Sequence, residues 1–325
     1  MITGYNASGD RLVVVDIAPA TPGDTVWIDL QSPSLEEEHG LESALGVDLP
    51  TREEMQEIEQ SSRLYSEDGA QFMTALIPAQ TEGDTPIMAP VTFVLVGNRL
   101  VTIRYHDPKS FGLFVQRTAK GGVAFASGEE VMLSLLEVMV DRMADVLERV
   151  GRDVDTISRT IFAQRAASAR PRGGEVWRAT LEEIGRKGDM ISHIRDSLGT
   201  LDRLAVFFGQ RLRGETAVAE VQERVKDLVG DIRSLSDHST FAAQKVTFLL
   251  DATLGLIGIE QNRIMQIFSV AAVVFMPPTL VASIYGMNFA VMPELTWPWG
   301  YPAALCVILI AAVGPYLWFR RKGWL

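Results

Sequence analysis

Residues 264–284 read IMQIFSVAAVVFMPPTLVASI, and residues 301–319 read YPAALCVILIAAVGPYLWF. Neither stretch contains a charged side chain, and each is long enough to cross about 30 Å of hydrocarbon as an α-helix. The two segments therefore predict a pair of transmembrane helices. Two crossings bring the chain back to the side of the membrane from which it started.

The charges that flank the two segments predict their orientation. Arg263 precedes the first segment and the sequence RRK at 320–322 follows the second, whereas residues 289–300 between them contain no Lys or Arg. Because basic residues are retained on the cytoplasmic side, both termini are predicted to be cytoplasmic. The chain is thus predicted to be a multi-pass protein of the lipid bilayer.

The chain as a whole is acidic. It contains 41 Asp and Glu against 30 Lys and Arg, a formal net charge of −11. This balance argues against nucleic acid as a partner and favours cations. The alternative is that the acidic charge keeps a cytoplasmic domain soluble. The four histidines are far apart and no catalytic or phosphate-loop motif is present, so we do not expect an enzyme.

Ahead of the membrane segments, the pattern predicts an α/β domain. Runs of β-branched and apolar residues predict strands at 12–16, 26–30, 72–77, 91–96 and 100–105, the last two paired as a hairpin. Thr51 and Glu54 have the spacing of a capping box, which predicts that a helix begins there.

From Gly128 onward, Leu, Val and Met recur at helical spacing. A break at 170–174 separates two long helices, which we expect to lie antiparallel. A third helix begins after Gly214 and continues into the first membrane segment, over roughly 100 Å at ~1.5 Å per residue. The acidic face of the helical pair is interpreted as a solvated surface, with an ion site as the alternative; it includes Glu130, Glu137, Asp141, Asp145, Asp153 and Asp155.

One face of the third helix carries small or polar residues at alternating steps of four and three. The positions are Asp251, Gly255, Gly258, Asn262, Met265, Ser269, Ala272, Met276, Thr279 and Ser283. The remaining positions are mostly Leu, Ile, Val and Phe. Because lipid offers polar groups no partner, this polar stripe with heptad spacing indicates like helices around a water-filled axis. Close helix packing through small residues is the alternative interpretation.

Two features of this helix suggest how a pore would bend and close. Pro277 and Pro278 remove two backbone donors and predict a bend. Phe268 borders the polar stripe and, together with Met265 and Met276, can form a hydrophobic constriction that stops ions by dewetting.

The sequence Tyr285-Gly286-Met287-Asn288-Phe289, followed by Met292-Pro293-Glu294 and a single terminal span, resembles the CorA family of magnesium channels. The resemblance implies a funnel-shaped homopentamer in a bacterial-type inner membrane, with the first transmembrane helices around the pore. It implies influx of Mg²⁺, and also of Co²⁺ and Ni²⁺, down the electrochemical gradient. Gly286, Met287 and Asn288 would form the selectivity filter for the hydrated ion.

The same resemblance implies roles for other residues. Gly286 is expected to permit a sharp turn, and Glu294 is expected to concentrate cations at the outer mouth. Asp251 corresponds to a regulatory magnesium site between subunits, with Glu82 and Asp84 as candidate partner acids. Magnesium bound there would close the channel. The pore-lining residues would be Asn262, Met265, Phe268, Ser269, Ala272, Met276, Thr279 and Ser283.

Two other functions stay open. A zinc transporter of the ZntB branch shares this layout but commonly varies the middle residue of the motif, so Met287 favours magnesium. A membrane-anchored cytoplasmic sensor or scaffold belongs to a different class, and it would not need the polar stripe.

These inferences divide the α+β membrane protein into seven parts. They are a cytoplasmic α/β domain (1–128), an antiparallel helical pair (129–213), a stalk helix (214–263), a pore-lining transmembrane helix (264–286), a periplasmic loop with the Gly-Met-Asn motif (287–300), a second transmembrane helix (301–319) and a basic cytoplasmic tail (320–325).

Overall fold

A computed structural model describes residues 1–19, 22–83, 85–122, 124–167, 174–212, 219–288 and 292–324. The chain divides into two compact units. The first is built from residues up to 167 together with 178–250, and the second from residues 251–324 together with the beginning of the helix that contains Trp177.

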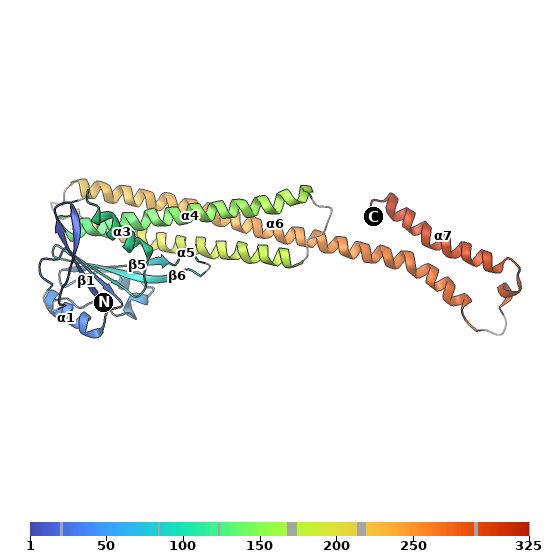
Figure 1. Cartoon of the computed structure of the whole chain (residues 1–325), viewed down its shortest axis with the longest axis horizontal. Helices are drawn as coiled ribbons and strands as arrows, with labels where there is room; N and C mark the ends of the chain where they lie inside the picture. Colours follow the sequence, from blue (N-terminus) through green and yellow to red (C-terminus); the bar gives the residue numbers. More distant parts are fainter. Residues whose placement is uncertain are drawn as a thin grey trace. The chain divides into compact units, whose positions relative to one another are not determined.

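The first unit contains a seven-stranded sheet (Figure 1). Its strands are β1 (Ile2–Ser8), β2 (Arg11–Val15), β3 (Trp27–Gln31), β4 (Leu64–Glu67), β5 (Ala70–Ala79), β6 (Ile87–Val96) and β7 (Arg99–Arg104), in the order β2-β1-β3-β7-β6-β5-β4. β3 pairs with β7 in parallel, and the other neighbours pair antiparallel. The predicted strands are confirmed, as is the hairpin, in which Val94 faces Val101.

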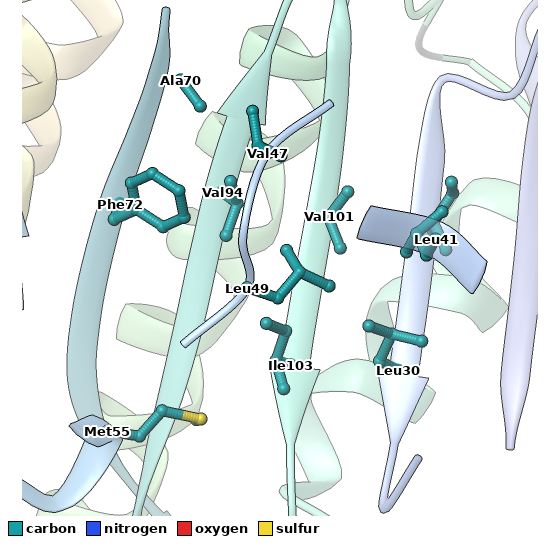
Figure 2. Packing of buried hydrophobic residues seen from close by; sticks show 11 residues of the cluster. Leu30, Leu41, Val47, Leu49, Met55, Ala70, Phe72, Val94, Val101 and Ile103 are labelled. Carbon is teal, nitrogen blue, oxygen red and sulfur yellow. The ribbon is translucent and has the colours of Figure 1, made fainter. Parts of the chain in front are cut away.

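Both faces of the sheet are covered, which explains why its central strands read as continuous apolar runs. On one face, α1 (Leu35–Leu45), the segment after it and the 3₁₀ turn η1 (Glu54–Gln56) pack on the strands. Leu49 and Met55 from this layer belong to the same buried cluster as Val94, Val101 and Ile103, and Figure 2 shows Leu49 beside Val101 and Ile103. On the other face, α3 (Lys109–Ala119) places two phenylalanines, Phe111 and Phe114, against Trp27.

The capping box predicted at Thr51 forms but does not begin an α-helix. The Glu54 backbone N–H donates to Thr51 Oγ1 at 3.3 Å, and the Thr51 N–H donates to Glu54 Oε2 at 2.8 Å. Only the three-residue η1 follows, and after it the short α2 (Gln60–Arg63). A capping box satisfies the first donors of a helix but supplies no apolar face to extend it. The box that does begin an α-helix joins Ser34 and Glu37 in α1.

Three long helices follow the sheet: α4 (Gly128–Ala167), α5 (Gly174–Leu212) and α6 (Ala219–Tyr285). Within the first unit, Glu129 near the start of α4 pairs with Arg211 near the end of α5, and Asp153 farther along α4 pairs with Lys187. The two helices are therefore antiparallel, as predicted. The predicted break at 170–174 lies mostly outside the described residues.

Gly128 begins α4 at a point of close backbone approach. A Cβ placed there would lie 2.4 Å from the Leu100 backbone nitrogen and 2.5 Å from the Arg99 carbonyl carbon. We expect Gly128→Ala to destabilise the chain by about 1–3 kcal/mol, since backbone atoms cannot move aside as a flexible side chain can. Thermal unfolding of the detergent-purified chain, followed by circular dichroism, measures this loss.

Gly151, within the same helix, supplies the matched control. A Cβ at Gly151 meets nothing within 4 Å, so Gly151→Ala should stabilise the helix by about 0.5–1 kcal/mol. Equal melting temperatures for the two variants would contradict the proposed steric clash at Gly128.

Candidate ion pathway

Among the described residues, two helices are long and apolar enough to cross a membrane: the end of α6, and α7 (Gly300–Arg321). Their large apolar side chains are exposed in the single chain, Phe268 and Phe275 each to 70% and Leu309 to 66%. A soluble protein rarely leaves so continuous an apolar surface uncovered. These surfaces therefore require lipid or another protein surface.

The polar stripe lies on the exposed surface of α6. Of the predicted pore-lining residues, Met265 and Met276 are 67% and 69% exposed, and Asn262, Phe268, Ser269, Ala272, Thr279 and Ser283 are exposed as well. One polar residue of the stripe has a hydrogen-bond partner within the helix itself: the Thr279 hydroxyl donates to the Phe275 carbonyl at 2.7 Å. Such a bond lets a threonine remain in an apolar helix.

α6 continues through Pro277 and Pro278 and ends at Tyr285. Neither proline can donate to the helical carbonyl four residues before it, so the carbonyls of Val273 and Val274 lose their usual partners. Those two residues lie three and two positions before Met276, inside the part of the helix that carries the polar stripe.

The Gly-Met-Asn motif forms the turn that ends α6. The Gly286 N–H donates the last helical bond to the Ala282 carbonyl at 2.9 Å, and the Met287 N–H donates to the Ile284 carbonyl at 3.3 Å. Gly286 does not have the positive φ that its expected role in a sharp turn would require. A Cβ at Gly286 would instead make a close contact with the backbone, because it would lie 3.1 Å from the Ala282 carbonyl oxygen.

Asn288 is exposed beyond this turn. It is not in the left-handed conformation of a capping asparagine. Its carboxamide forms no hydrogen bond to another described residue. Glu294 lies in the 3₁₀ turn η2 (Pro293–Thr296), while its side chain and residues 289–291 lie outside the described part.

The candidate regulatory acids differ in their surroundings. Asp251 is exposed on α6. The Glu82 carboxylate accepts from Lys109 at 2.5 Å and from Arg142 at 3.1 Å, and the hydrogen bond from Lys109 together with its charge lowers the pKa of Glu82. Asp84 lies outside the described residues. Among the residues that the structure describes, no three His, Cys, Asp or Glu side chains are grouped as metal ligands.

Several residues of the acidic face of α4 contact basic partners that the sequence pattern did not reveal. Glu137 pairs with Arg224 of α6 at 2.8 Å, Asp153 with Lys187 at 2.6 Å, and Asp155 with Lys245. The interpretation as a merely solvated surface is thus incomplete, because these carboxylates join neighbouring helices. Their partners lie 34 to 90 residues away along the chain, beyond the range of any helical spacing rule.

The fold and the two apolar helices define a class of protein: a membrane protein with an α/β domain, long helices and two spans. The CorA-like Mg²⁺ transporter protein family model matches residues 22–321. The magnesium transport protein CorA of Pasteurella multocida (strain Pm70) is 36% identical over 326 residues, and that of Escherichia coli (strain K12) is 35% identical over 327; both alignments cover all of both chains. The chain belongs to the CorA-like Mg²⁺ transporter family, which consists of ion transporters and not enzymes.

The fold has a solved counterpart. The complete structure of the CorA magnesium transporter from Methanocaldococcus jannaschii matches with a TM-score of 0.78 at 20% identity, covering 100% of this chain and 99% of that one. The likeness extends from the α/β domain to the second predicted span.

Proposed function

We propose that the chain is a channel that admits Mg²⁺ to the cytoplasm, as a homopentamer whose α6 helices surround the pore. The names of the full-length relatives support magnesium as the ion. The observation that carries the proposal is the exposed polar stripe of α6, which leads to Asn288, whose carboxamide bonds to no other described residue. Residues 264–286 would line the pore and 301–319 would form the outer span, with both termini cytoplasmic.

Selection would act on the hydrated ion. Mg²⁺ sheds water reluctantly and prefers octahedral oxygen ligands. A ring of Asn288 carboxamide oxygens, with Gly286 carbonyls beside it, can accept hydrogen bonds from the ion's water shell without removing it. Glu294, repeated in each subunit, would raise the local cation concentration. Co²⁺ and Ni²⁺ would enter by the same route.

Closure would use two parts of α6. Met265, Phe268 and Met276 are exposed on the helix, and rings of these side chains would form a constriction that excludes water. At the cytoplasmic side, Asp251 would bind Mg²⁺ against an acid of the neighbouring subunit, Glu82 or Asp84. Glu82 would first have to release Lys109 and Arg142.

Metal uptake by reconstituted liposomes tests the proposed function. An inside-negative potential of 100 mV supplies ~4.6 kcal/mol per divalent ion, so Mg²⁺ should enter without another energy source. We expect uptake of Mg²⁺, Co²⁺ and Ni²⁺, and much slower uptake of Zn²⁺. Zinc uptake without magnesium uptake would instead identify a zinc transporter, and no uptake of any metal would favour a sensor or scaffold.

Asp251→Lys should weaken inhibition by internal magnesium. The substitution replaces an anionic ligand with a cation, so closure should require roughly tenfold more Mg²⁺ or more, equivalent to at least about 1.4 kcal/mol of lost binding. Fluorescent uptake assays at stepped internal Mg²⁺ measure the shift. Glu223→Lys changes an exposed acid elsewhere on α6 and should leave inhibition unchanged; an equal response of both variants would remove Asp251 from the mechanism.

A further inference from the structure

A second candidate site lies in the α/β domain, entirely within the first unit. A pocket of about 580 Å³ forms where the end of β5 and the start of β6 approach η1, α2 and the residues that follow β7. Arg52 and Gln56 are exposed at this pocket, while Arg63 is half-buried. Its volume is in the usual range for a small-molecule site, ~300–1,000 Å³.

Two arginines of the pocket, Arg52 and Arg63, form no ion pair with a described acid. The Arg52 guanidinium lies 5.0 Å from the centre of the Tyr105 ring, and Arg63 Nε donates to the Glu57 carbonyl at 2.5 Å. Burial, and then the charge of nearby Arg203, lowers the pKa of Arg63.

The other ionisable groups of the pocket do not offset this charge. Asp107 already forms an ion pair with Arg104, at 2.7 Å. The His106 ring lies 2.8 Å from the Ile77 carbonyl, and burial lowers the pKa of His106, which disfavours a positive charge on the ring. Both guanidinium groups differ in this respect from partly buried Arg224, which pairs with the Glu137 carboxylate at 2.8 Å.

Part of the pocket wall is apolar. It includes Leu76 from β5 and Ile87, Met88 and Pro90 from β6. Ile87 is 42% exposed, so an apolar surface is available to a planar ligand. The pocket therefore combines two guanidinium groups with an apolar wall.

We propose that this pocket binds a nucleoside polyphosphate. Guanidinium groups match phosphate oxygens with paired, charge-assisted hydrogen bonds, and Arg52 and Arg63 would hold the phosphates. The apolar wall would cover one face of the base. Inorganic phosphate alone would leave the wall and most of the volume unused. The site needs no glycine-rich phosphate loop, because its residues come from separate strands and turns.

Calorimetric titration of the full-length chain in detergent with ATP tests the proposal. EDTA is included so that the phosphates keep their full charge. We expect saturable binding, and we expect Arg63→Gln and Arg52→Gln each to weaken it by roughly 10- to 100-fold, the effect of losing one charge-assisted pair. Arg159→Gln, an exposed arginine of α4 outside the pocket, is the matched control and should bind as the parent chain does.

Further titrations separate the two parts of the site. Tripolyphosphate should bind more weakly than ATP, since it does not reach the apolar wall; equal affinity would refute the nucleoside part of the proposal. Absence of saturable ATP binding would overturn the proposed site. The same conclusion would follow if neither pocket variant changed ATP binding while both kept the circular dichroism of the parent chain. Because the readout is binding and not ion flux, failure here leaves the proposed channel function intact.

Discussion

Asn288→Ala is expected to abolish selective magnesium uptake while leaving the chain folded. The carboxamide is exposed and makes no hydrogen bond to another described residue, so its loss removes no contact that holds the described fold together. In the proposed pore, each subunit would lose one hydrogen bond to the hydrated ion, worth about 0.5–1.5 kcal/mol. Repeated around a pentamer, this loss should lower magnesium flux at least tenfold, as measured by dye-based uptake in liposomes.

The control for this experiment is a nearby loop residue. Thr296 donates only to the Pro293 carbonyl within η2, at 2.8 Å, so Thr296→Ala should conduct normally. Asn288→Gln restores a carboxamide on a longer side chain and should recover part of the flux. Full magnesium flux through Asn288→Ala, with the discrimination against zinc unchanged, would show that the filter lies elsewhere.

The sequence predicts those parts of the fold that depend on local pattern. The β6–β7 hairpin follows from two runs of β-branched and apolar residues around a two-residue turn, and its strands pair with Val96 opposite Arg99. The long helices follow from periodicity that continues over many turns. The prediction that a helix begins at Thr51 was wrong, because the segment around Met55 packs on the sheet as a single 3₁₀ turn.

The candidate sites, like the fold, are predictable from sequence only where their residues follow a local pattern. The polar stripe of α6 is visible in sequence because one helix carries all of it, from Asp251 to Ser283. The surroundings of Glu82 are not visible, because Lys109 and Arg142 lie 27 and 60 residues away and only tertiary packing brings them to it. The pocket near Arg63 was missed for that reason too. Its residues have no shared spacing.

Arg104→Met is expected to destabilise the α/β domain by about 3–5 kcal/mol, since it leaves a buried carboxylate without its counter-ion. Arg104 and Asp29 are each only 7% exposed and lie 2.9 Å apart. Asp29 would retain a single side-chain donor, the Thr102 hydroxyl at 2.7 Å, which also accepts from Trp27 at 3.0 Å. Equilibrium urea unfolding in detergent, followed by tryptophan fluorescence, measures the loss.

Two further variants identify the cause. Arg104→Met combined with Asp29→Asn removes the unpaired charge but keeps an oxygen that can accept from Thr102, so it should be more stable than Arg104→Met alone. Arg178→Met breaks an exposed ion pair, in which the Arg178 side chain is 83% exposed and the Glu182 side chain 55% exposed. This variant should lose no more than about 1 kcal/mol of stability. If the double variant were no more stable than Arg104→Met, the loss would come from packing of the guanidinium, which lies 4.4 Å from the centre of the Phe111 ring, and not from a buried charge.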